Sequence, residues 1–66
     1  MIVFQVDDMS CAHCSAAITQ AVKAVDADAQ LRIDLDAHRV EIDSRTANAG
    51  QFDAAIREAG YTPKPA

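Results

Sequence analysis

The sequence predicts an α+β fold in which a four-stranded antiparallel sheet is covered on one face by two helices. Alternating or β-branched apolar residues indicate short strands, and apolar residues at spacings of three and four indicate two helices. The two kinds of segment follow one another in the order β-α-β-β-α-β. Packing both helices on one face of an open sheet is the simplest way to bury their apolar sides.

The N-terminal part of the chain predicts a strand and a helix joined by a loop. Residues 2–6 form a β-branched and aromatic run that stops at two aspartates. From about Cys14 to Val25, apolar residues recur at helical spacing. We expect Ser10 to cap the first turn of this helix, and Lys23 to complement the helix dipole near its C-terminal end.

The middle of the chain predicts an antiparallel hairpin. Apolar and charged residues alternate over residues 31–35 and again over residues 39–43, so the charged side chains of both runs are expected on a solvent-facing side. The turn is expected at residues 36–38, with His38 as a solvated polar residue in it.

The second helix is predicted together with both of its ends. Asn48 and Gln51 have the spacing of a capping box, and Gly60 stands where a glycine commonly ends a helix. A last short strand is expected to begin at Tyr61. The two prolines that follow restrict this strand to a sheet edge or a frayed tail.

Length and composition limit the classes of function. Sixty-six residues predict a single domain over residues 1–66. A formal charge of −4 and the lack of tryptophan argue against binding to nucleic acid. No run approaches the roughly 20 apolar residues of a membrane-spanning helix, and no basic and apolar signal segment begins the chain. We therefore expect a soluble cytoplasmic protein with no membrane insertion.

The soft metal ligands are concentrated in residues 9–14, Met-Ser-Cys-Ala-His-Cys. A disulfide between Cys11 and Cys14 would close too short a loop to stabilise the fold. Two thiolates at this spacing can instead bind one ion, and the N-terminus of the following helix favours the thiolate form. Thiolates select Cu(I), Zn(II) and other thiophilic ions over magnesium or calcium.

The number of ligands favours copper over structural zinc. A closed zinc site normally needs four protein ligands, whereas this loop offers Cys11, Cys14 and the adjacent His13. Cu(I) accepts two sulfur ligands and leaves room for an incoming thiolate. We expect an exchangeable Cu(I) site on the two cysteines, with His13 as a candidate auxiliary ligand and Met9 packed in the core.

The loop and its setting resemble the heavy-metal-associated (HMA) domain family, specifically a stand-alone bacterial copper chaperone. The resemblance rests on the M-x-C-x-x-C loop after the first strand, on the order of the elements and on Gly60-Tyr61, and it covers essentially the whole chain. It implies a ferredoxin-like fold, no enzymatic activity, and Cu(I) carried on Cys11 and Cys14. It also implies transfer of the ion by thiolate exchange to the N-terminal metal-binding domain of a copper-transporting P-type ATPase.

Two residues of the loop differ from the commonest family pattern, and three others are expected to support the metal site. Asp8 replaces the glycine that often precedes the motif methionine, and His13 favours zinc somewhat or adds a weak third copper ligand. Zinc-exporting relatives often carry an aspartate where this chain has Ser10, so the balance favours copper. By the same resemblance, we expect Met9, Ser10 and Tyr61 to support the site from outside its ligand set, with Tyr61 beside the metal loop.

Other functions and assemblies stay open at this point. Zn(II) or Hg(II) trafficking would use the same fold, because thiolates bind all of these ions well. A small thiol-disulfide oxidoreductase also carries C-x-x-C near a β-α boundary, although no tryptophan or proline flanks this pair. A homodimer bridged by shared metal is a further expectation. Docking to a partner is expected to depend on ionic strength, because Asp7 and Asp8 flank the site.

Overall fold

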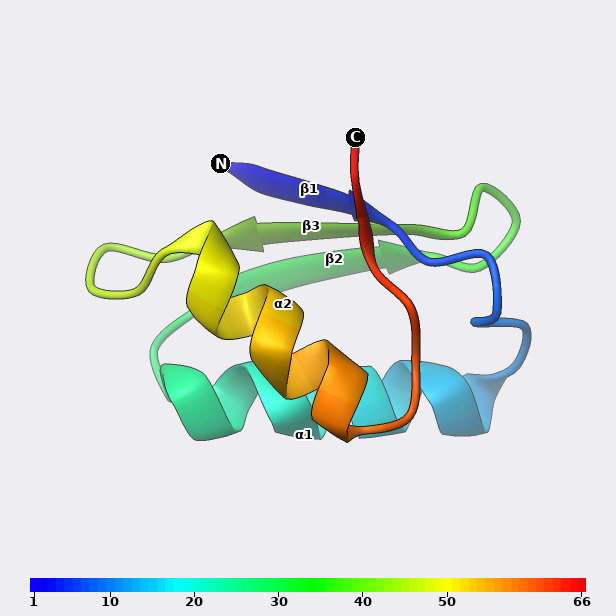
Figure 1. Cartoon of the computed structure of the whole chain (residues 1–66), viewed down its shortest axis with the longest axis horizontal. Helices are drawn as coiled ribbons and strands as arrows, with labels where there is room; N and C mark the ends of the chain where they lie inside the picture. Colours follow the sequence, from blue (N-terminus) through cyan, green and yellow to red (C-terminus); the bar gives the residue numbers. More distant parts are fainter.

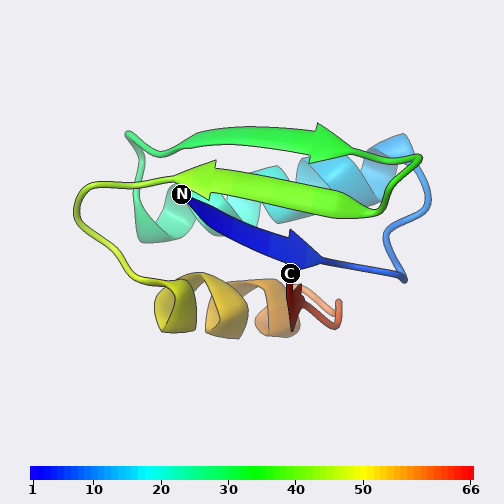
Figure 2. The same cartoon turned by 90° about the horizontal axis from the view of Figure 1, so that it is seen from above.

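The computed structural model describes the whole chain, Met1–Ala66. Its elements are β1 (Ile2–Gln5), α1 (Ala12–Val25), β2 (Gln30–Asp34), β3 (Arg39–Asp43), α2 (Ala49–Glu58) and β4 (Lys64–Pro65). The sheet pairs only antiparallel neighbours, in the order β2-β3-β1-β4. Both helices lie on one face of this sheet (Figure 1 and Figure 2). The predicted ferredoxin-like α+β fold is therefore confirmed.

The core lies between the sheet and the two helices. Each helix contributes two fully buried side chains from its predicted apolar side, Ile18 and Val22 from α1 and Phe52 and Ile56 from α2. Burying one such side chain stabilises a fold by about 1.5–3 kcal/mol. The helices are therefore held mainly by this shared core. Neither helix is long and apolar enough to cross a membrane.

The first helix begins earlier than the sequence predicts. It starts at Ala12, with Cys11 as the N-cap residue, and no side chain caps it. The prediction that Ser10 is the cap is therefore wrong. The physical reason is that the Cys11 carbonyl already accepts the first helical hydrogen bond, from the Ser15 N–H at 3.1 Å. Lys23 lies in the last turn, as expected, and its ammonium donates to the Ala29 carbonyl at 2.6 Å.

Both predicted ends of the second helix are confirmed. Asn48 Oδ1 accepts from the Gln51 N–H, and Gln51 Oε1 accepts from the Asn48 N–H, each at 3.0 Å. Gly60 follows the helix with a φ of +100°, which an L side chain rarely adopts. The Tyr61 N–H then donates back to the Ile56 carbonyl at 3.2 Å. This turn sends the chain back towards the loop that carries the cysteines.

The last strand begins three residues later than predicted. It runs along the sheet edge beside β1 and starts at Lys64, not at Tyr61. The Thr62 N–H donates to the Asp8 carboxylate instead of to a strand, and Pro63 has no N–H to donate. The edge position that the prolines predict is confirmed.

Candidate metal centre

The loop that joins β1 to α1 carries both cysteines and is anchored by Met9. The Met9 side chain is fully buried in the core, as expected, and its N–H donates to the Val6 carbonyl at 3.1 Å. Ser10 and Cys11 follow directly and are exposed. The part of the loop that carries the cysteines therefore begins at Met9, which is fixed in the core, and extends from there into solvent.

The structure brings the two cysteines together. Their Sγ atoms lie 3.4 Å apart, and both are free thiols. Cys11 is exposed, whereas Cys14 lies in the first turn of α1, half-buried against the core. Cys11 is thus open to solvent, whereas Cys14 is held by the fold.

The environment of Cys14 favours the thiolate. Its pKa is lowered from the ordinary 9.0 to about 7. The largest cause is the Tyr61 hydroxyl, which acts as a hydrogen-bond donor to the sulfur, followed by the Ser10 backbone N–H and by Cys11. The same interaction raises the pKa of the Tyr61 hydroxyl. Near neutral pH a substantial fraction of Cys14 is therefore ready to act as a ligand or nucleophile.

His13 does not complete a cluster around the cysteines. It is exposed on the first turn of α1. No group of three or more histidine, cysteine or carboxylate side chains is arranged to hold a metal ion. The structure thus brings only the two sulfurs together, and coordination by His13 stays a prediction.

Two supporting contacts of the loop were not predicted from the sequence. His38 Nδ1 lies 2.7 Å from the Met9 carbonyl oxygen, so the expectation of a merely solvated turn residue is wrong. The Asp8 carboxylate accepts a hydrogen bond from the Thr62 N–H at 3.2 Å. Asp8 had a weak sequence signal, because it stands where the family often has glycine. His38 had none, because the contact joins residues far apart in the chain.

The other aspartate of the loop is already paired. Asp7 lies 3.3 Å from the Lys64 ammonium and accepts from the Gln5 amide at 2.9 Å. The Gln5 and Lys64 contacts lower its pKa in that order. The charge of Asp7 is thus partly compensated within the protein, and the expected salt dependence of docking stays a prediction.

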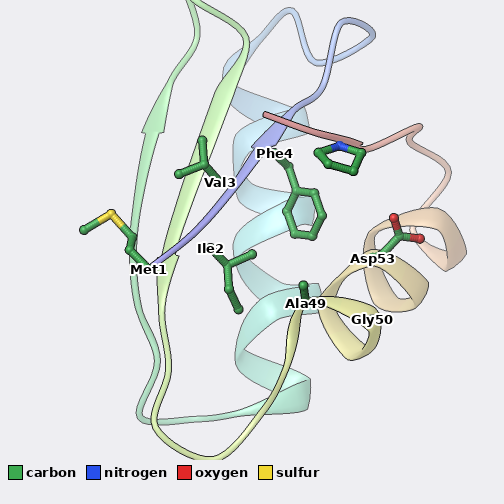
Figure 3. Close-up of a pocket in the computed structure, with 8 residues that line it drawn as sticks. Met1, Ile2, Val3, Phe4, Ala49, Gly50 and Asp53 are labelled. Carbon is green, nitrogen blue, oxygen red and sulfur yellow. The ribbon is translucent and has the colours of Figure 1, made fainter.

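A shallow apolar hollow of about 390 Å³ lies between β1 and α2 (Figure 3). Neither cysteine lines it, and Asp53 is its only side chain with metal-binding oxygen atoms. It therefore offers no alternative metal site. Its lining is formed by residues 1–4, Ala49, Gly50, Asp53 and Pro65.

The chain is similar to known proteins over most of its length. A family model described as "Heavy-metal-associated domain" matches residues 3–62. The chain is 33% identical over 64 residues to the copper chaperone CopZ of Staphylococcus haemolyticus, and the match covers 94% of each chain. It is 37% identical over 59 residues to Copper-transporting ATPase 2 of Rhizobium meliloti, a match that covers 86% of this chain and 7% of that protein.

The fold also matches solved structures. A trimeric form of a mutant of the copper chaperone Atx1 from Synechocystis PCC6803 superposes with a TM-score of 0.92. The sequence identity is 34%, and the match covers 97% of this chain and 100% of that chain. Both the sequence and the arrangement of the elements are thus shared with this group of proteins.

Proposed function

Because this chain belongs to the heavy-metal-associated domain family, we propose that it is a copper chaperone that binds one Cu(I) ion through Cys11 and Cys14. The observation that carries the proposal is the pair of free thiols, 3.4 Å apart, at an exposed loop. Two sulfurs without a built third ligand suit Cu(I) better than a closed zinc site, which normally has four ligands.

Loading requires a small movement of the thiols. A metal–thiolate bond of about 2.3 Å would separate the two sulfurs by about 3.8 Å at a tetrahedral angle and by about 4.6 Å in linear coordination. The separation of 3.4 Å is shorter than both. Cys14 is held in the first turn of α1, so we propose that the exposed Cys11 rotates outward to admit the ion.

The ion leaves by ligand exchange. A cysteine thiolate of the acceptor attacks the bound Cu(I), a three-coordinate shared state forms, and the two donor sulfurs leave one after the other. Each displaced thiolate takes up a proton when the pH lies below its pKa, and copper keeps its oxidation state throughout. The direction of transfer follows the relative affinities and concentrations of donor and acceptor.

The proposed acceptor is the N-terminal metal-binding domain of a copper-transporting P-type ATPase. The likeness of this chain to a segment of such an ATPase supports a partner of the same fold. Transfer would take place in the cytoplasm. A second copy of the chain can also complete the two-sulfur site, which would give a metal-bridged homodimer at high protein concentration.

An anaerobic Cu(I) titration against a bathocuproine-type chelator tests the proposal. We expect one equivalent to be retained by the wild type, and much weaker retention by Cys11→Ser and by Cys14→Ser. Gln20→Ala is the control, because it changes an exposed position of α1 outside the loop and leaves both thiols. Reduction of insulin disulfides at useful rates, together with failure to hold Cu(I), would instead favour the oxidoreductase.

Zn(II) or Hg(II) trafficking is the second candidate. The observation that favours zinc is the exposed His13 between the two cysteines. Competition among the three ions, followed by transfer to a candidate acceptor, separates the candidates. Preferential retention and delivery of Zn(II), abolished by His13→Gln, would contradict the copper assignment.

A further inference from the structure

The turn between β2 and β3 packs against the metal loop. His38 Nδ1 lies 2.7 Å from the Met9 carbonyl oxygen, 29 residues away in the sequence. The His38 carbonyl accepts from the Val6 N–H at 2.7 Å, and the Gln5 amide donates to the Ala37 carbonyl at 3.0 Å. Figures 1 and 2 both show this turn beside the loop, at the same end of the molecule.

The contact between His38 and Met9 defines which ring nitrogen carries the hydrogen. A carbonyl oxygen can only accept, so Nδ1 of His38 must donate. The distance of 2.7 Å is at the short end of the range for N–H···O hydrogen bonds, and the contact is partly buried. In the neutral ring, Nε2 is then the nitrogen without a hydrogen.

This hydrogen bond completes the fixation of Met9. The Met9 side chain is fully buried, its N–H is bound to the Val6 carbonyl, and its carbonyl is bound to His38. The next two residues, Ser10 and Cys11, are exposed. The contact with His38 therefore holds the loop backbone at Met9, two residues before the outward-facing thiol.

We propose that His38 is a positioning residue for the metal site: by holding the Met9 carbonyl, it keeps the Cys11 sulfur within reach of Cys14. This inference rests on the proposed binding of Cu(I) by the two cysteines. Groups that hold a ligand in place reduce the ordering that the metal must impose, and their loss commonly weakens metal binding 10- to 100-fold. His38 acts through the backbone and touches neither sulfur, so we expect a loss of about tenfold, at the lower end of that range.

The backbone of His38 dictates the choice of variants. Its φ is +55°, in the left-handed region that glycine and asparagine tolerate well. His38→Gly removes the donor without adding backbone strain. His38→Asn keeps that backbone and places an amide N–H close to the position of Nδ1. His38→Ala would remove the donor and also strain the backbone, so the two effects could not be separated.

The test combines Cu(I) competition with urea unfolding of the metal-free proteins. We expect His38→Gly to bind Cu(I) about tenfold more weakly than the wild type, and His38→Asn to restore the affinity. A lower unfolding midpoint for His38→Gly with unchanged Cu(I) affinity of the folded protein would overturn the proposal. Failure of the wild type itself to retain Cu(I) would overturn the proposed function instead.

Nitrogen-15 NMR of the metal-free wild type tests the contact independently of copper. We expect the His38 ring to carry its hydrogen on Nδ1 at a pH where the ring is neutral. A ring with its hydrogen on Nε2 alone would contradict the hydrogen bond to Met9, and with it the positioning role.

Discussion

The Asp8 carboxylate accepts a hydrogen bond from the backbone N–H of Thr62 at 3.2 Å. Thr62 directly follows Tyr61, whose hydroxyl is the largest cause of the lowered pKa of Cys14. An exposed side chain of the metal loop thus ties down the C-terminal segment that places the tyrosine against the thiol. This contact joins the loop that carries the cysteines to the segment that carries Tyr61, and its two residues are 54 positions apart in the sequence.

Replacement of Asp8 should release Tyr61 from Cys14. We expect Asp8→Gly to raise the pKa of Cys14, because the tyrosine hydroxyl no longer stabilises the thiolate. Asp8→Asn is the matched control, since its side-chain oxygen still accepts from Thr62. Tyr61 is the only tyrosine and tryptophan is absent, so intrinsic fluorescence reports a change in the environment of Tyr61. Loss of negative charge alone would lower the pKa of Cys14, so a fall in Asp8→Gly would contradict the prediction.

Removal of the tyrosine hydroxyl should make Cys14 less acidic. We expect Tyr61→Phe to move the pKa of Cys14 upward from about 7, because the hydroxyl is the first cause of its lowering. The measurement is the pH dependence of thiol alkylation, with Cys11→Ser compared with Cys11→Ser/Tyr61→Phe so that a single thiol reacts. The midpoint should rise, and alkylation at neutral pH should slow. Equal midpoints would show that Tyr61 does not act on the thiol.

The lowered pKa of Cys14 also predicts how stability depends on pH. The folded protein releases the thiol proton at about 7, whereas the unfolded chain releases it near the ordinary 9.0. The free energy of unfolding should therefore rise with pH between about 7 and 9, and this contribution should be lost as the pH falls through 7. Urea unfolding of the wild type and of Cys14→Ser checks this. The difference between their free energies of unfolding should grow with pH over this range. A constant difference would show that the Cys14 thiol does not contribute to the pH dependence of stability.

Met9 should matter for packing and not for ligation. Its side chain is fully buried, so Met9→Ala should lower the free energy of unfolding by about 2–5 kcal/mol. Met9→Leu keeps the volume and should cost less than about 1.5 kcal/mol. We expect Met9→Leu to bind Cu(I) with wild-type affinity in chelator competition. A marked loss of affinity in this folded variant would instead make the thioether a ligand.

The capping box of α2 should stabilise the domain measurably. Asn48→Ala removes the acceptor for the Gln51 N–H and should lower the free energy of unfolding by about 1 kcal/mol. Gln20→Ala, at an exposed position in α1, is the control and should change stability by less than about 0.5 kcal/mol. Equal effects of the two variants in urea unfolding would argue against a specific role of the cap.

Local patterns predicted the elements well where the interactions act within a few residues. The Asn48–Gln51 box and the turn at Gly60 depend only on neighbours along the chain, and both are present as predicted. Ser10 was wrongly predicted as a cap because several polar residues precede the apolar run of α1, and the pattern cannot choose among them. The late start of β4 reflects the missing N–H of Pro63 and also the contact of Thr62 with Asp8, more than 50 residues earlier in the sequence.

By itself, the sequence determined the order of strands and helices, the burial of Met9 and the presence of two thiols three residues apart, since each follows from spacing and residue type. The cysteines stay the proposed ligands. Only the tertiary structure decided that His38 holds the Met9 carbonyl and that Asp8 holds the segment beside Tyr61. Hydrogen bonds between residues so far apart in the chain have no sequence periodicity. They form because packing two helices on one sheet face brings three separate loops to the same end of the molecule.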